Sequence, residues 1–413
     1  MSSYTKNNHI PTLRFPGFVG EWEEKTISDI AYVLQGFGFP DKYQGQTTGD
    51  LPFCKVGDIS AAVDKGERII SHAANYVNYS LLPTLHARPI PEGATIFAKI
   101  GEAIRSNKRI MTGCPCLIDN NAAAVKAKEG ESDEFIFYLM SNVNLADYAG
   151  GIVPSVNKST VETISVLIPP TIAEQKKIAS CLSNIDSLIA AQNRIVAAVK
   201  EKKKGLMQQL FPQPGETTPR LRFPGFKGEW KEFFLGDSFD ERTEKNRGDL
   251  PLLSLGDEGL VMQSDTKRKD NSNADKSKYL RVSVDDIAYN TMRMWQGRCV
   301  YANIEGIVSP AYTVCKPKEG IDSLFHYYLF KTKKMINLFH QNSQGLVSDT
   351  LNLKYEAFSK IKYYLPPSLE EQKKIASCLS EMDEIITAQG KLVEVLKSHK
   401  KGLMQQLFPQ LDK

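Results

Sequence analysis

The sequence lacks long hydrophobic runs, and this absence sets its first limits. No apolar run approaches the roughly 20 residues that a transmembrane helix needs. The opening residues, MSSYTKNNHIPTLRF, contain no apolar core of a signal peptide. We therefore expect a cytoplasmic protein that does not interact with membranes.

The cysteines and histidines form no pattern typical of a disulfide framework or a metal site. The seven cysteines are odd in number and scattered, which favours reduced thiols. Cys114 and Cys116 lie too close together for the usual spacing of zinc ligands, and the six histidines contain no metal-ligand pair. We therefore predict no metal site in this chain.

Motifs of ATP binding and of methyl transfer are also missing. There is no G-x-x-x-x-G-K-[ST] phosphate loop, which argues against an ATP-driven motor. There is no [ND]-P-P-[YF] tetrapeptide, which positions the target amine in amino-methyltransferases, because Pro169-Pro170 and Pro366-Pro367 follow Ile and Leu. We predict no catalytic residues.

The composition is that of an ordinary globular protein. The 413 residues are 41% hydrophobic and 24% charged, and they suffice for two or three domains. The net charge of +4 is only mildly basic. Binding to nucleic acid would therefore have to come from local patches.

A 46-residue block occurs twice in the chain without a gap. The copies are residues 168–213, IPPTIAEQKKIASCLSNIDSLIAAQNRIVAAVKEKKKGLMQQLFPQ, and residues 365–410, LPPSLEEQKKIASCLSEMDEIITAQGKLVEVLKSHKKGLMQQLFPQ, and 29 of the 46 aligned positions are identical. A shorter repeat precedes each half, PTLRFPGFVGEW at 11–22 and PRLRFPGFKGEW at 219–230. Two equivalent halves usually perform one task at two places on one partner.

Each block is predicted to form a long helix with one apolar seam. Thr171-x-x-Glu174 and Ser368-x-x-Glu371 have the pattern of capping boxes at a helix start. Apolar residues then alternate at spacings of four and three over about four to five heptads, as in a coiled coil. The central seam positions are Ile178, Leu182, Ile185, Ile189, Gln192 and Val196 in the first copy, and Ile375, Leu379, Met382, Ile386, Gln389 and Val393 in the second. Lys203 and Lys400 are further polar seam positions.

The expected partner of each seam is the other copy. If a two-fold axis relates the halves, the helices run antiparallel, each roughly 55 Å long at 1.5 Å per residue, and act as a spacer. The alternative is a helix buried within its own domain. Gly205 or Gly402 could also end or bend either helix early.

A fragment of each block also has a catalytic interpretation. Glu174-x-Lys176 and Glu371-x-Lys373 match the E-x-K part of a nuclease site. Both glutamates lie in the first turn of a helix, where a carboxylate is favoured by the helix dipole. We therefore favour a structural role.

The segments before the helices share a frame but differ inside. Each has short β-like runs, a helical stretch, a glycine-containing turn (GGIVPSVNKST or SQGLVSDTLNLK) and a final strand (ISVLIPP or IKYYLPP). The sequence predicts an α+β protein with two α/β domains, residues 1–167 and 216–364, joined by helices at 168–215 and 365–413 that form an antiparallel coiled coil with pseudo-two-fold symmetry. Two domains with the same surrounding elements but different interior sequences are what we expect of two recognition domains for different targets.

One cluster in each interior is a candidate for binding DNA. Cations crowd around Gly101 in the first half, and a glycine turn in the second carries Arg, Gln and Trp, which suits contacts with phosphates and base edges. The candidate DNA-binding residues are Lys55, Lys99, Arg105, Asn107, Lys108 and Arg109 in the first half, and Asn290, Arg293, Trp295, Gln296 and Arg298 in the second. We interpret Lys108 and Arg109 as phosphate anchors and Arg293 and Gln296 as base readers. The alternative is that both are solvated surface turns.

On these motifs the chain resembles the specificity subunit of type I restriction-modification systems. The resemblance rests on the LRFPGF-x-GEW repeat, IPP-TIAEQKKIA and LPP-SLEEQKKIA, the KKGLMQQLF helix ends, and NTMRMWQG…GIVSPAY at 290–312. It covers nearly the whole length, in the order recognition domain, helix, recognition domain, helix.

The resemblance implies a non-catalytic reader of double-stranded DNA. Each target-recognition domain would read one half of a bipartite site, and the helices would set the gap and dock two modification (methyltransferase) subunits, which restriction subunits can join. S-adenosylmethionine, ATP and Mg²⁺ are expected on those partners, with no cofactor in this chain. The alternatives are a stand-alone DNA methyltransferase or nuclease, and a coiled-coil adaptor with no role on DNA.

Overall fold

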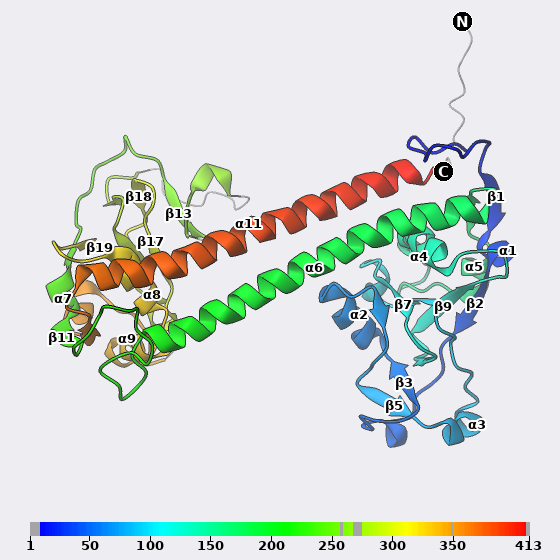
Figure 1. The fold of residues 1–413 in the computed structure, drawn as a ribbon, viewed down its shortest axis with the longest axis horizontal. Coiled ribbons are helices and arrows are strands. Elements are labelled where there is room, and N and C mark those ends of the chain that lie inside the picture. Colours follow the sequence, from blue (N-terminus) through cyan, green and yellow to red (C-terminus); the bar gives the residue numbers. More distant parts are fainter. Residues whose placement is uncertain (1–8, 257–258, 267–274, 348–349, 410–413) are drawn as a thin grey trace, which may run out of the picture. The chain divides into compact units, whose positions relative to one another are not determined.

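The computed structural model describes residues 9–256, 259–266, 275–347 and 350–409 (Figure 1). The described chain divides into two compact units, of which the first combines the residues up to Ile195 with those from Gln389 onward, and the second is Val196–Ala388. Each unit therefore holds one α/β domain and one part of each long helix. Residues 1–8 and Gln410, the last residue of the second block, lie outside the described residues.

The two repeated blocks form the long helices α6 (Ile172–Leu210) and α11 (Leu369–Leu407), of 39 residues each. Both continue through Gly205 and Gly402, so an early end at these glycines is wrong. A glycine costs only about 1 kcal/mol in a helix interior, which the packing of the flanking turns offsets.

The helices run antiparallel, as predicted, and each unit shows this separately. In the first unit, Ile178 and Leu182 of α6 share a core with Leu407 at the end of α11. In the second unit, Ile375 and Leu379 of α11 share a core with Leu210 at the end of α6. The beginning of one helix thus packs with the end of the other (Figure 1).

The predicted seam residues face this packing. All twelve central seam positions are buried or half-buried. The side-chain Oε1 atoms of Gln192 and Gln389 are buried and have no hydrogen-bond partner among the described residues. Because an unpaired polar atom costs stability, these glutamines are candidates for residues that fix the register of the pair.

The first unit contains two main sheets. The larger has the strand order β2 (Ala31–Gln35), β9 (Ala122–Ala127), β6 (Thr95–Ala98), β7 (Arg109–Thr112) and β4 (Ile69–Ile70), and the smaller has the order β5 (Asn75–Val77), β3 (Leu51–Cys54) and β8 (Leu117–Ile118). Helix α4 (Asp133–Asn142) contacts β6, β7 and β9 and buries its middle residues in the core. The remaining helices are α1 (Ile27–Ile30), α2 (Val56–Asp64), α3 (Leu82–Leu85) and α5 (Lys158–Glu162).

The second unit has a smaller central sheet. Its order is β12 (Phe239–Glu241), β19 (Tyr312–Pro317), β16 (Ile287–Asn290) and β17 (Cys299–Tyr301). The pairs β13 (Leu253–Gly256) with β14 (Gly259–Met262) and β15 (Leu280–Val282) with β18 (Gly306–Val308) accompany it. Its helices are α7 (Leu235–Ser238), α8 (Ser323–Phe330), α9 (Lys333–Asn342) and α10 (Tyr355–Phe358).

The same frame encloses these unlike interiors. Antiparallel strands β1 (Glu23–Thr26) and β10 (Ser165–Ile168) close the first domain, and β11 (Lys231–Phe234) and β20 (Lys362–Leu365) close the second. The tryptophan that ends each LRFPGF repeat, Trp22 or Trp230, is buried in the core of its own unit. The predicted α+β architecture, two α/β domains with a pair of long antiparallel helices, is confirmed.

Candidate nucleic-acid interface

The frame of each unit is held by a buried ion pair that involves the first-turn glutamate. Arg14 donates two hydrogen bonds of 2.8 Å to the Glu174 carboxylate, and Arg222 donates bonds of 2.8 and 2.6 Å to Glu371. Both glutamates are 1% exposed. The catalytic interpretation of E-x-K does not fit a carboxylate that is already bound to arginine.

The same contacts correct part of the capping prediction. The hydroxyls of Thr171 and Ser368 accept hydrogen bonds from the N–H groups of Glu174 and Glu371, at 3.3 and 3.4 Å. The glutamate carboxylates bind the LRFPGF arginines instead of reaching back to the helix start. The arginine and the glutamate were both visible in the repeats, but their pairing joins positions 160 and 149 residues apart.

A second duplicated cluster joins each domain to the helix pair. In the first unit, Asp186 of α6 accepts hydrogen bonds from Tyr138 at 2.7 Å and from Lys400 of α11 at 2.6 Å. In the second unit, Asp383 accepts them from Tyr328 at 2.8 Å and from Lys203 at 2.5 Å. These pairs explain why the seam carries a lysine in both copies.

The cation cluster of the first domain is partly exposed. Lys99 follows β6, and Arg105 follows the short 3-10 helix η3 (Glu102–Ile104). The side chain of Arg105 is 66% exposed and pairs with Glu102 at 3.2 Å, a weak surface contact. Burial lowers the pKa of Lys99, and the nearby Asp119 opposes this. Arg105 and Lys99 remain candidates for phosphate contact.

Two other predicted contacts of this cluster, Asn107 and Arg109, are engaged within the domain. Arg109 is 5% exposed, packs over Phe97 and donates to the carbonyl of Met140 at 3.2 Å and to the side chain of Asn107 at 2.7 Å. Burial lowers the pKa of Arg109 to about 9. Its interpretation as a phosphate anchor is wrong, because the guanidinium is inside the core.

Lys108 and Lys55 also have internal partners. Lys108 pairs with Asp64 at 2.7 Å, with its own side chain 25% exposed. Lys55 precedes α2, where its Nζ donates to Gln44 and lies 5.6 Å from the centre of the Phe39 ring. A phosphate would have to compete with these contacts.

The cluster of the second domain is more open. The 3-10 helix η6 (Met294–Gln296) follows Arg293, and Gly297 ends it in the left-handed conformation that glycine favours. The side chains of Arg293, Gln296 and Arg298 are exposed, and no partner for them is found within the described ranges. These three residues therefore keep their hydrogen-bonding groups free for a ligand.

Asn290 and Trp295 shape this loop. The side chain of Asn290 accepts from the Met292 N–H at 2.9 Å, and the Trp295 indole N–H donates to the Met292 carbonyl at 3.1 Å. The ring of Trp295 also contacts His340 of α9 edge-on, at 5.8 Å between centroids. Both residues are placed to hold the loop rather than to read bases freely.

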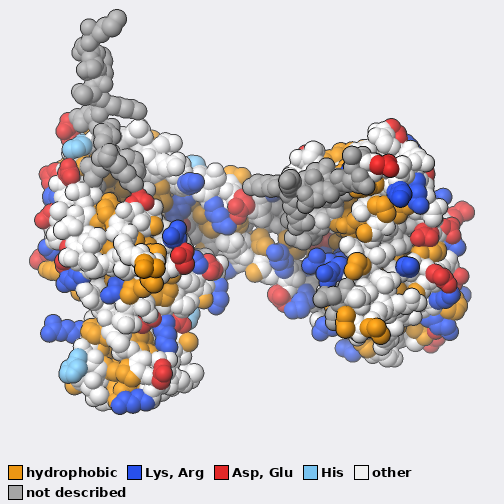
Figure 2. Space-filling model, turned by 180° about the vertical axis from the view of Figure 1, so that it is seen from behind, with side chains coloured by type: hydrophobic (Ala, Val, Ile, Leu, Met, Phe, Trp, Pro, Cys, Tyr) orange, Lys and Arg blue, Asp and Glu red, His pale blue; other side chains and the backbone are white. Residues whose placement is uncertain are grey.

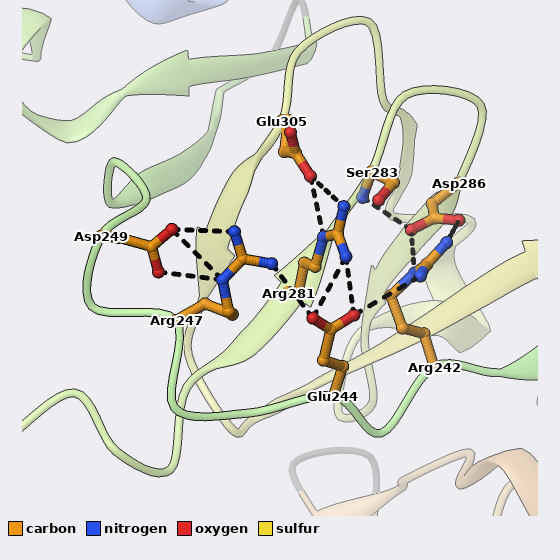
Figure 3. Close-up of polar contacts among 8 residues, drawn as sticks. All are labelled: Arg242, Glu244, Arg247, Asp249, Arg281, Ser283, Asp286 and Glu305. Carbon is orange, nitrogen blue, oxygen red and sulfur yellow. Dashed lines mark hydrogen bonds and ion pairs between the residues drawn. The ribbon is translucent and has the colours of Figure 1, made fainter.

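Many other arginines of the second domain are committed to a salt-bridge network (Figure 3). Arg281 bridges Glu244 and Glu305, and Arg247 bridges Glu244 and Asp249. Arg242 binds the fully buried Asp286 at 2.7 Å, yet burial still raises the pKa of this carboxyl. The network fixes loops around β15, and its arginines are not free cations.

The charged surface is mixed. On the face drawn in Figure 2, lysines and arginines are interspersed with acidic and apolar side chains. Within the second unit, a cavity of about 310 Å³ has a lysine-rich lining: Lys200, Lys203, Lys204, Lys331 and Lys333. Several of these lysines already have partners: Lys203 pairs with Asp383, and Lys331 donates to the carbonyls of Gly297 and Cys299.

Sequence reasoning missed one exposed apolar feature beside each cluster. The glycine-containing turns carry Ile152 and Val153 in the first domain, 104% and 60% exposed, and Leu346 and Val347 in the second, 101% and 61% exposed. The signal was present as an aliphatic pair after glycine in both turns.

Neither a metal-binding cluster nor a membrane-spanning helix occurs among the described residues. In the described parts of the chain, no group of three or more His, Cys, Asp or Glu residues could hold a metal ion. Over the same residues, no helix has the length and apolar character to span a membrane.

Comparison with known proteins identifies relatives of this arrangement. Over 275 residues, 62% of this chain and 60% of the relative, it is 26% identical to the putative type I restriction enzyme MjaX specificity subunit of Methanocaldococcus jannaschii. Over 300 residues, 67% of this chain and 69% of the relative, it is 24% identical to the MjaVIII specificity subunit of the same organism. The match thus spans about three fifths of the length of the first relative.

A solved structure has the same fold. The crystal structure of the type I restriction-modification system S subunit from M. genitalium aligns with a TM-score of 0.62 at 13% identity, covering 97% of this chain and 100% of that one. The family described as type I restriction modification DNA specificity domain matches residues 20–201 and 227–397. These matches include most of both halves, and the chain therefore belongs to the type I restriction modification DNA specificity domain family.

Proposed function

We propose that this chain is the non-catalytic DNA-reading subunit of a type I restriction-modification complex. The observation that carries the proposal is one frame built twice around two different interiors. The contacts Arg14–Glu174 and Tyr138–Asp186 recur as Arg222–Glu371 and Tyr328–Asp383, whereas the sheets between them differ in strand number and order. Such a chain presents two different surfaces in equivalent settings.

Each interior would read one half of a bipartite site in double-stranded DNA. In the second domain, Arg293 and Gln296 have the paired donors and acceptors that recognise base edges in the major groove. In the first domain, Arg105 and Lys99 supply charge for the phosphates. The continuous helices α6 and α11 would set the number of base pairs between the half-sites.

The helices would also dock two modification subunits, which restriction subunits can join. Apolar side chains outside the seam support a helical partner: Leu188 and Ile195 of α6 are seven residues apart and 54% and 43% exposed. Their counterparts Ile385 and Leu392 of α11 are 45% and 40% exposed. S-adenosylmethionine, ATP and Mg²⁺ would belong to the partners, and methyl transfer and cleavage would not occur on this chain.

The test is to sequence the methylated bases of cells that produce this chain with its modification subunits. We expect one asymmetric motif with two specified halves and a fixed unspecified gap. The purified chain alone should neither methylate nor cleave that sequence. Methylation by the chain alone, or a motif that does not change when residues 231–364 are exchanged, would contradict the proposal.

A further inference from the structure

Each recognition domain carries an exposed aliphatic tip that its own fold does not use. Ile152 and Val153 form the tip of the turn before α5, and Leu346 and Val347 lie in the equivalent turn before α10. The exposures of the two pairs are nearly equal, 104% and 60% against 101% and 61%. Aliphatic side chains that are this exposed to water gain the favourable free energy of burial only when a partner covers them.

The first tip is built into the candidate DNA-binding loop. Gly150 and Ser155 exchange two backbone hydrogen bonds of 3.1 Å, which closes the turn. The Gly101 N–H donates to the Pro154 carbonyl at 2.7 Å, and the Val156 N–H donates to the Lys99 carbonyl at 2.9 Å. The tip is thus fixed directly beside the segment that carries Lys99 and Arg105.

The second tip has the same relation to the second cluster. Gln344 and Asn352 exchange two backbone hydrogen bonds of 2.8 Å, and the Leu353 N–H donates to the Thr291 carbonyl at 2.8 Å. Gly345 has a φ of 151°, and a Cβ on it would lie 2.6 Å from the Thr350 carbonyl oxygen. The close approach requires glycine, so the turn that presents Leu346 and Val347 is specified by the sequence.

We propose that both tips are apolar wedges that press against the base stack of the bound duplex, one in each half-site. This inference rests on the proposed DNA-reading function and names how the half-sites are gripped. Aliphatic side chains cannot read donors and acceptors of base edges, but they can insert at a base step and bend the duplex. The interiors of the two domains differ while the tips stay alike, which fits a feature that all duplexes share.

A protein partner is the alternative occupant, and the surroundings of the tips favour DNA. The tips lie beside free or weakly paired cations, Arg105 in one domain and Arg293 in the other. The helices offer a protein partner a separate apolar surface that includes Leu188 and Ile195. Interfaces with DNA combine such cations with apolar wedges.

The test uses the full complex with its modification subunits and a duplex that carries the methylated motif, labelled with donor and acceptor dyes at its ends. The variants are I152S with V153S, and L346S with V347S. V19S and V284S are matched controls, because Val19 is 82% and Val284 is 53% exposed and neither belongs to the two tip turns. Ile152→Leu and Leu346→Ile keep the apolar surface and should behave as the wild type.

We expect each serine pair to weaken binding by about tenfold and to reduce the bend reported by energy transfer. The slope of affinity against salt should not change, because no phosphate contact is lost. Size-exclusion chromatography with light scattering should show the normal assembly.

Three results would overturn the wedge. Serine pairs that bind and bend the duplex like the wild type would show that the tips do not touch DNA. A lower slope of affinity against salt in the serine variants would show that the loss of binding comes from a displaced basic loop. Failure of the variants to assemble with the modification subunits would show that the tips bind a protein partner. If the wild-type complex binds all duplex sequences equally, the proposed DNA-reading function is wrong as well. This result would differ from failure of the wedge alone, in which the wild-type complex still prefers its own motif.

Discussion

Replacing Arg14 with Ala should unfold the edge of the first unit selectively. Arg14 is 14% and Glu174 only 2% exposed in their side chains, and the pair makes two hydrogen bonds of 2.8 Å. Arg14 also donates to the carbonyl of Val19 at 3.1 Å, which holds the LRFPGF turn. The substitution leaves a buried carboxylate without its counter-charge.

The expected cost follows from that burial. A buried pair that loses one partner costs about 3–5 kcal/mol, whereas an exposed pair contributes less than about 1 kcal/mol. Local opening should therefore become about two to three and a half orders of magnitude more frequent, at roughly 1.4 kcal/mol per factor of ten. Adding Glu174→Gln to the variant removes the uncompensated charge and should restore a large part of the loss.

The assay is hydrogen exchange read by mass spectrometry, because a chain of two units need not unfold in one step. Protection should fall in peptides from β1, β10 and the start of α6, and stay unchanged in β11 and β20. Arg222→Ala is the matched control and should show the reverse pattern. A cost below about 1 kcal/mol, or equal loss in both units, would refute the role of the pair in holding its own unit.

Four further predictions concern reading, spacing, register and pH. Arg293→Ala should cost about 1–3 kcal/mol of binding free energy in a titration and relax the sequence preference at one half-site only. Arg105→Ala should instead weaken binding to all duplexes and lower the slope of affinity against salt by about one. Equal effects of Arg293→Ala on both half-sites would contradict base reading. One heptad inserted in each helix adds roughly 10 Å at 1.5 Å per residue, so the methylated motif should gain about three base pairs in its gap, and an unchanged gap would exclude the helices as spacers. Gln192→Leu should raise the stability of the helix pair in urea but allow more than one register. The registers would be seen as heterogeneous cross-links between engineered cysteines. A less stable pair would argue against a cost from the buried amide. His326 is buried, its Nδ1–H donates to the Asp322 carbonyl at 2.7 Å, and burial lowers its pKa from 6.5 to about 4. Its contribution to the free energy of unfolding is therefore complete above pH 6.5 and is lost as the pH falls toward 4, by about 3 kcal/mol in all. His326→Gln should flatten this pH dependence of stability in urea titrations.

The long helices could be predicted because their information is local and repeated. The seam that includes Ile178 and Leu182 has the coiled-coil period, and the second copy supplied the partner. The antiparallel direction followed from the order of segments along the chain. Helix propensity alone favours an end at Gly205, but tertiary packing of the flanking turns outweighs it and α6 continues to Leu210.

The status of the individual cations could not be predicted in the same way. Lys99, Arg105 and Arg109 are equivalent in a list of charges, but their roles depend on whether the chain folds over them. Arg109 opens strand β7, and helix α4 provides the Met140 carbonyl that it binds. That contact joins residues 31 positions apart and has no local signature.

Under the proposed function, the distribution of paired and free cations would let a chain of net charge +4 bind a polyanionic ligand. Arginines of the frame and of the network in Figure 3 are neutralised by carboxylates such as Glu174 and Asp286, so they add little to the field outside the protein. Arg293 and Arg298 keep their charge at the surface, next to a glycine turn that lets the backbone approach a ligand closely. Attraction to phosphates is then local to the reading loops, which favours sites where the base contacts also fit over binding anywhere along a duplex.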